Sequence, residues 1–255
     1  MKQAHARNAW VLLCIVGFIA FYATRGSPWL SQLIWAGLGL GSAAIVTVVA
    51  GRRRVFARSA WLLVAAAMTL TVLINGIRAA TSISPRTASN TSVAYGISLT
   101  IVFSLLTVAA YLLVNRHRRT AADSSGIVDA AIVFVAASMV ATDFLVFPFW
   151  SDPALNTAER MGLLLFDALN VLLLSLTVRL WFSTERSVNR ASRVLAVGFI
   201  AMIFAGGLGL AEFLPVQVID PELGRNLIFG FSMIFFAVST LAALDSTANR
   251  PPAAD

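Results

Sequence analysis

The feature that most constrains this chain is a series of eight apolar runs joined by short loops. The runs cover residues 9–24, 28–50, 59–80, 92–114, 127–149, 159–182, 192–213 and 223–244. Most exceed the roughly 20 residues that an α-helix needs to cross a ~30 Å hydrocarbon layer. Charged residues make up only 12% of the 255 residues, about half the usual share in soluble domains. We therefore expect an all-α, polytopic transmembrane bundle of eight helices.

The residue pattern within the runs favours helices over the strands of a membrane barrel. Barrel strands are about ten residues long and alternate apolar with polar side chains. The stretches 163–166 and 171–174 are continuously apolar. Hydrocarbon also favours helices because each helix satisfies its own backbone hydrogen bonds. The expected organisation is a tail over residues 1–8, a transmembrane domain over 9–244 and a short tail over 245–255.

The first run has two interpretations, because Lys2 and Arg7 precede it as they would precede a secretory signal. Residues 20–25 contain no good A-x-A cleavage site, which favours an uncleaved first helix.

The basic residues predict the orientation of the helices. One side of the predicted membrane holds most of the 19 basic residues: Lys2, Arg7, Arg52, Arg53, Arg54, Arg58, Arg116, Arg118, Arg119, Arg179, Arg186, Arg190, Arg193 and Arg250. The other side holds Arg25, Arg78, Arg86, Arg160 and Arg225. The positive-inside rule therefore predicts that both termini lie in the cytoplasm and that the protein resides in the inner, cytoplasmic membrane of a cell.

Several classes of protein are disfavoured by residue usage. Lys2 is the only lysine and lies outside the runs, which excludes a retinal Schiff base. Cys14 is the only cysteine, so no intrachain disulfide forms. His5 and His117 flank runs among arginines without a zinc-ligand cluster. The net charge of +7 is distributed over run ends rather than on one face, so we expect no nucleic-acid partner. No metal or cofactor is expected.

Polar side chains inside the outer halves of the runs are the candidates for chemistry. A charge at the bilayer centre costs at least ~2.5–3.5 kcal/mol, so such groups tend to be paired, water-facing or functional. Asp143 and Asp167 lie in consecutive runs, which predicts similar depths in an antiparallel hairpin. We expect a polar pocket that opens outward, lined by Asp143, Asp167, Asn75, Asn170 and Glu212 and closed by Arg78, Arg160 and Arg225. The alternative is a purely structural network of ion pairs and hydrogen bonds.

Two further interpretations of these polar residues remain open, a small-solute transporter and an intramembrane enzyme that uses Asp143 and Asp167. The prolines fall at run ends or in loops, so no broken central helix supports a transporter. An intramembrane aspartyl protease pairs YD with GxGD, whereas Asp143 follows Thr142 and residues 207–210 lack an aspartate. No GxSxG, HExxH, Walker A or dinucleotide motif is present, so we expect no enzymatic activity.

Small residues and a weak internal similarity predict how the helices pack. The glycines at 37 and 41 form a GxxxG, and small residues cluster at 205–209, both typical of close helix contacts. A homodimer through the GxxxG is the alternative. Residues 58–65 and 190–197 are similar sequences that lie at the starts of two runs. This similarity indicates either repeated two-helix hairpins or shared topology alone.

Several stretches resemble the multi-helix membrane module that precedes the GGDEF or GGDEF–EAL region in actinobacterial cyclic-di-GMP signalling proteins. The stretches are Arg52-Arg53-Arg54 with Trp61, Ser125-Gly126-Ile127-Val128-Asp129-Ala130-Ala131-Ile132-Val133, Phe144-Leu145-Val146-Phe147-Pro148, Phe166-Asp167-Ala168-Leu169-Asn170-Val171-Leu172-Leu173-Leu174 and Ala242-Ala243-Leu244-Asp245-Ser246.

The resemblance implies a sensory or regulatory module that is not an enzyme by itself and that acts on a cytoplasmic output protein or a C-terminal output domain. The chain departs from the family at Asn75-Gly76 and near Gly206, where the family often has acidic residues, and it contains no GGDEF or EAL sequence.

Overall fold

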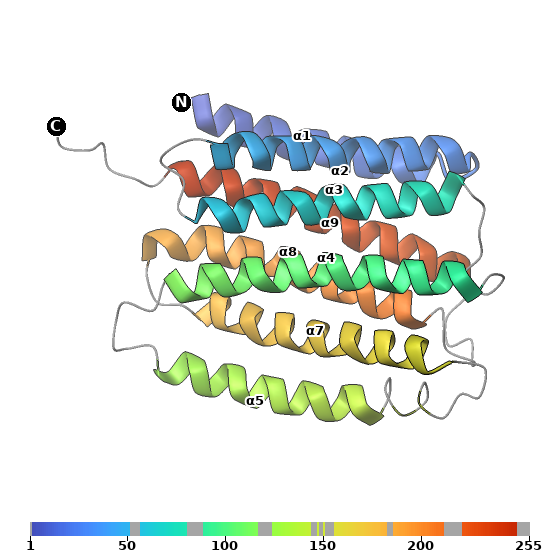
Figure 1. Cartoon of the computed structure of the whole chain (residues 1–255). Helices are drawn as coiled ribbons and strands as arrows, with labels where there is room; N and C mark the ends of the chain where they lie inside the picture. The colour runs from blue at the N-terminus through green and yellow to red at the C-terminus, as the bar shows by residue number, and fades with distance from the viewer. Residues whose placement is uncertain are drawn as a thin grey trace.

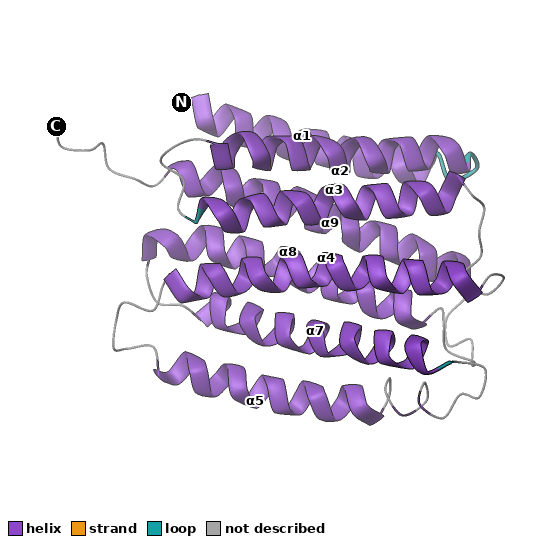
Figure 2. Cartoon of the chain, in the orientation of Figure 1, coloured by secondary structure: helices purple, strands orange, loops and turns teal. Residues whose placement is uncertain are grey.

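A computed structural model shows that the described part of the chain is helical. It describes residues 2–51, 57–80, 89–116, 124–143, 147, 150, 156–182, 186–211 and 221–248. Every regular element in these ranges is a helix (Figure 2). The helices are α1 (Lys2–Ala23), α2 (Pro28–Gly51), α3 (Arg58–Ala80), α4 (Ser89–Arg116), α5 (Ser124–Ala141), α7 (Thr157–Phe182), α8 (Arg186–Ala211) and α9 (Pro221–Ala248). The predicted all-α bundle of eight helices is confirmed.

Length and composition make seven of these helices capable of crossing a membrane. Their apolar spans are His5–Ala23, Trp29–Gly51, Arg58–Ile77, Gly96–Asn115, Arg160–Phe182, Arg190–Leu208 and Asn226–Ser246. The eighth helix, α5, has a shorter apolar stretch over Ala130–Val140 among the described residues. The chain is therefore a multi-pass integral membrane protein.

Six helices form a closed ring, and the remaining two lie outside it. In the order α2, α3, α4, α7, α8 and α9, each helix packs against the next, and α9 packs against α2. Helix α1 packs against α2 and α9, whereas α5 packs against α7 at the opposite edge (Figure 1). Successive helices alternate in direction, so α1 begins and α9 ends at the same end of the bundle, here named the terminal end (Figure 1).

Several serine and threonine side chains inside the spans form hydrogen bonds within their own helices. The Ser42 hydroxyl donates to the Leu38 carbonyl at 2.7 Å, and the Thr71 hydroxyl donates to the Ala67 carbonyl at 2.8 Å. This bond to the preceding turn satisfies a hydroxyl without a partner from another helix. The helices therefore carry polar residues through hydrocarbon at little cost.

The helix bounds differ most from the predicted runs in α1 and α5. Helix α1 begins at Lys2, because the polar residues of the predicted tail include strong helix formers that extend the helix beyond its apolar part. Helix α5 ends at Ala141, well before residue 149, and Thr142 and Asp143 form a wider π turn. The Thr142 hydroxyl donates to the Ser138 carbonyl at 2.7 Å, a side-chain bond of the kind that often bends helices. Hydropathy continues across this turn and could not reveal it.

Candidate functional site

One face of α7 carries a buried carboxyl and a buried amide. Asp167 is 8% exposed and Asn170 is 9% exposed. Residues three apart lie side by side on a helix, so these two side chains are neighbours. The Asn170 Nδ2 donates to the Phe166 carbonyl at 3.0 Å, while the Asn170 Oδ1 is buried without a hydrogen-bond partner among the described residues. This face of α7 therefore contains an acceptor that lacks a donor.

Close packing occurs at Phe166, the residue before Asp167. The rings of Phe166 on α7 and Phe103 on α4 meet edge to face, with centroids 4.8 Å apart. Gly206 on α8 lies against both rings, because a Cβ added there would be 2.6 Å from Phe103 Cζ and 3.1 Å from Phe166 Cζ. Three helices thus meet at Phe166.

A second polar atom without a partner lies at the same level. Helices α4 and α7 run in the same direction (Figure 1), and Thr107 follows Phe103 by one helical turn as Asn170 follows Phe166. Residues four apart share a helix face, so the Phe103–Phe166 contact places Thr107 and Asn170 level on the packed faces. The Thr107 Oγ1 is buried and has no hydrogen-bond partner within the described residues. We name Asp167, Asn170 and Thr107 the polar cluster.

The other predicted pocket residues lie in different surroundings. Asp143 is exposed on the bundle surface beyond the end of α5, unlike buried Asp167. Asn75 is half-buried on α3 and donates through Nδ2 to the Thr71 carbonyl at 2.9 Å. Helices α3 and α7 both pack against α4 rather than extensively against one another. Asn75 is therefore on a helix that does not pack extensively against α7, which carries Asp167 and Asn170.

The four remaining predicted residues are described only in part. Arg160 lies in the first turn of α7, half-buried, and its backbone N–H donates to the Asn156 carbonyl at 3.1 Å. Arg78 and Arg225 belong to α3 and α9, but their side chains lie outside the description. Glu212 lies outside the described residues altogether.

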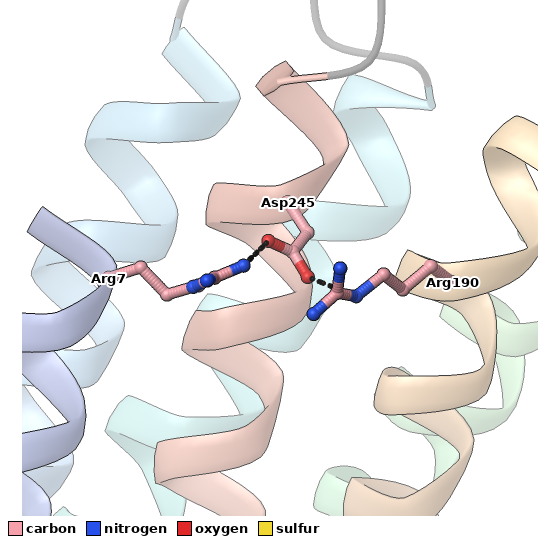
Figure 3. Close-up of polar contacts among 3 residues, drawn as sticks. All are labelled: Arg7, Arg190 and Asp245. Carbon is pink, nitrogen blue, oxygen red and sulfur yellow. Dashed lines mark ion pairs between the residues drawn. The ribbon is translucent and has the colours of Figure 1, made fainter. Parts of the chain in front are cut away.

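The described ion pairs lie at the terminal end. Asp245 Oδ1 on α9 is 3.8 Å from Arg7 Nη1 on α1, and Asp245 Oδ2 is 3.4 Å from Arg190 Nε on α8 (Figure 3). Asp245 lies in the last turn of α9, where the helix dipole disfavours a negative charge. The two arginines offset that cost and tie the ends of three helices together. We name these residues the arginine clasp.

Asp245→Asn should lower the free energy of unfolding by about 1 kcal/mol. Both arginines are partly exposed, so solvent screens most of the Coulomb energy. The loss should shrink at high salt, because mobile ions weaken exposed pairs. Thermal unfolding in detergent at low and high salt measures both effects, and Asp143→Asn serves as the exposed-carboxylate control. An equal loss in the two variants would contradict a stabilising clasp.

Sequence reasoning selected Asp167 and Asn170 but missed the other parts of both sites. In the sequence, Thr107 does not differ from other hydroxyl residues in apolar helices. It can be singled out only once α4 is known to pack against α7. In the sequence, Arg7 and Arg190 indicate only the orientation of the helices. An acidic residue in the last turn of a predicted helix, surrounded by basic helix ends, is the signal that could have identified Asp245.

No protein-family model matches the chain, and no curated protein or solved structure matches it. Within the described residues, no group of three or more His, Cys, Asp or Glu side chains could hold a metal ion.

Proposed function

We propose that this protein is a proton-responsive sensory or regulatory membrane module and is not an enzyme by itself. The observation that carries the proposal is buried Asp167 beside the unpartnered Asn170 Oδ1 on α7. A charged carboxylate inside hydrocarbon is costly and marks a functional position by default. Because Asp167 is buried among packed helices rather than exposed at a surface, its protonation state depends on how the helices pack.

A proton is the ligand that suits the chemistry of the polar cluster. A protonated carboxyl offers one O–H donor, whereas an ionised carboxylate only accepts hydrogen bonds. Protonated Asp167 can therefore donate to Asn170 Oδ1, whose own amide hydrogens are directed in part to the Phe166 carbonyl. Ionised Asp167 leaves the buried oxygen without a donor. The tight contacts of Gly206 with Phe103 and Phe166 also favour a proton over a bulkier ligand.

Helix α8 offers a physical connection from the polar cluster to the terminal end. Its Gly206 lies against Phe166, the residue before Asp167 in the sequence, and its Arg190 pairs with Asp245 at the other end of the same helix. A shift of α8 on protonation would change the arginine clasp and the position of α9. Such a shift requires that the proton bind the two packings with different affinity.

The terminal end is the side from which an output would be read. The excess of arginine there supports a cytoplasmic location under the positive-inside rule. The resemblance to modules that precede GGDEF and EAL regions supports a cytoplasmic output protein or output domain as the partner. A homodimer is compatible with this role.

A proton-coupled transporter is the second candidate, favoured by the same buried carboxyl. Transporters commonly bind solute at broken helices near the midplane. Helix α7 is continuous over Thr157–Phe182, and α8 is continuous over Arg186–Ala211. The continuity of these two helices favours the regulatory role over transport.

Asp167→Asn should abolish a pH-dependent change at the terminal end. Asparagine is neutral at every pH and donates through its amide, so it mimics the protonated state. A fluorophore on Ser246→Cys, in a Cys14→Ser background, reports on the clasp because Ser246 follows Asp245 on α9. Its emission should change with pH when Asp167 is present and stay constant in Asp167→Asn.

Infrared spectroscopy provides a direct readout of the same group. The C=O stretching band of a protonated carboxyl should disappear in Asp167→Asn and persist in the control Asp143→Asn, whose carboxylate is exposed. An unchanged pH response in Asp167→Asn would refute the proposal. Proton-dependent solute uptake into liposomes would establish the transporter instead.

A further inference from the structure

Helix α1 contacts α9 at two places that lie about two turns apart along α9. Near the terminal end, Trp10 Nε1 donates to the Ala237 carbonyl at 3.3 Å. Further along, a Cβ added at Gly230 would be 3.1 Å from the Tyr22 hydroxyl, so the helices approach closely there. The two contacts are roughly 10 Å apart along the helix axis. Between them the helices leave a groove.

The groove has a volume of about 310 Å³ and almost wholly apolar walls, which puts it at the small end of ligand sites. Its lining residues are Cys14, Ile15, Phe18 and Ile19 of α1, Leu38 and Ser42 of α2, and Met233, Ile234, Phe236 and Ala237 of α9. The Ser42 hydroxyl already donates to the Leu38 carbonyl, so a bound molecule need not offer it a hydrogen-bond acceptor. An apolar occupant is therefore favoured.

The groove opens sideways into the hydrocarbon layer. Its α1 residues lie within the span His5–Ala23, and its α9 residues lie within Asn226–Ser246. Ile15 and Ile19 are 51% and 64% exposed, so the α1 wall reaches the lipid-facing surface of the bundle. The long apolar molecules that fill this layer are lipid acyl chains.

A positive charge lies at the level expected for the headgroup of such a lipid. Arg7 precedes Cys14 by about two turns on α1, and Asp245 follows Ala237 by about two turns on α9. The arginine clasp is therefore roughly 10 Å beyond the groove, toward the terminal end. It combines two arginines with one carboxylate, and the Arg7 and Arg190 side chains are 39% and 66% exposed. This net positive charge complements a phosphate.

We infer that the groove binds one acyl chain of an anionic phospholipid whose phosphate contacts the arginine clasp. The bound chain would fill the space between α1, α2 and α9 and hold α1 against the ring. Because the headgroup would contact the arginines that pair with Asp245, the lipid would also influence the end of α9. This inference stands independently of the proton site on α7.

Native mass spectrometry of the protein from vesicles of phosphatidylglycerol, or of phosphatidylcholine alone, tests this inference. The wild-type chain should retain phosphatidylglycerol after stepwise delipidation and should release phosphatidylcholine. Ala237→Leu fills the groove while its backbone carbonyl remains available to Trp10, so it should abolish retention. The control Ala44→Leu adds the same volume at an exposed position of α2 that does not line the groove.

Retention that is equal in Ala237→Leu and Ala44→Leu, or equal for the two lipids, would overturn the inference. Photocrosslinking keeps the test valid should Ala237→Leu misfold, because it uses the unaltered chain. Phosphatidylglycerol with a diazirine in its acyl chain should label residues 14–19 and 233–237 preferentially. Labelling spread evenly over the exposed surface of α5 would show only bulk lipid contact.

Discussion

Trp35→Ala should destabilise the bundle by about 3 kcal/mol, the lower end of the range for buried tryptophan truncation. Trp35 on α2 is 2% exposed, and its ring centroid lies 5.1 Å from that of Phe229 and 5.7 Å from that of Phe236, both on α9. Lipid is as apolar as these side chains, so the loss comes from dispersion contacts and a cavity rather than from transfer to water. Thermal or denaturant unfolding in detergent, followed by circular dichroism, measures the loss.

Trp35→Phe is the matched control for this truncation. The Trp35 Nε1–H is buried without a hydrogen-bond partner among the described residues. Phenylalanine keeps a ring in the site and removes this unpaired donor, which offsets part of the lost volume. We expect a change within about 1 kcal/mol. Equal losses in Trp35→Phe and Trp35→Ala would contradict the packing role assigned to the ring.

Gly39→Ala should cost about 1–3 kcal/mol, the range for overpacking a close contact. A Cβ at Gly39 would clash with Val72 Cγ2 on α3 and would lie 2.9 Å from Phe236 Cε2 on α9. Val72 is β-branched and buried, and such a side chain has one strongly preferred rotamer in a helix. Helix α2 must therefore move away from both neighbours. The same unfolding measurement tests the expected loss.

Gly37→Ala is the control on the same helix, because a Cβ there meets nothing within 4 Å. Alanine favours a helix over glycine by about 1 kcal/mol, so this variant should be neutral or slightly more stable. A loss in Gly37→Ala as large as that in Gly39→Ala would mean that α2 does not contact α3 and α9 as described. It would indicate instead that the GxxxG face is covered by another helix or a second copy.

These glycines show how far the sequence could predict packing. The GxxxG at 37 and 41 predicted a close helix contact on α2, but a Cβ at Gly37 or Gly41 has open space around it. The contact is made by Gly39, on a different face. Residue types indicate that a helix can be approached closely, whereas the face depends on where its neighbours lie.

The tryptophans also show that residue type indicates a possible environment, whereas the neighbouring helices decide the actual one. Trp10, Trp29 and Trp61 lie near run ends, where tryptophans typically mark the membrane interface. The structure leaves Trp29 exposed but buries Trp10 and Trp61 among other helices. An indole near a helix end suits either place, because it needs only an apolar surface and a partner for its N–H.

The sequence by itself determined the environment and the number of helices. Both depend on local properties, because a run of about 20 apolar residues and a backbone that bonds to itself suffice for a membrane helix. The tertiary structure alone decided that Thr107 lies level with Asn170, that Asp245 joins Arg7 to Arg190, and that a groove remains beside Cys14. Each of these depends on which helices become neighbours, and that choice depends on side-chain contacts between residues far apart in the chain.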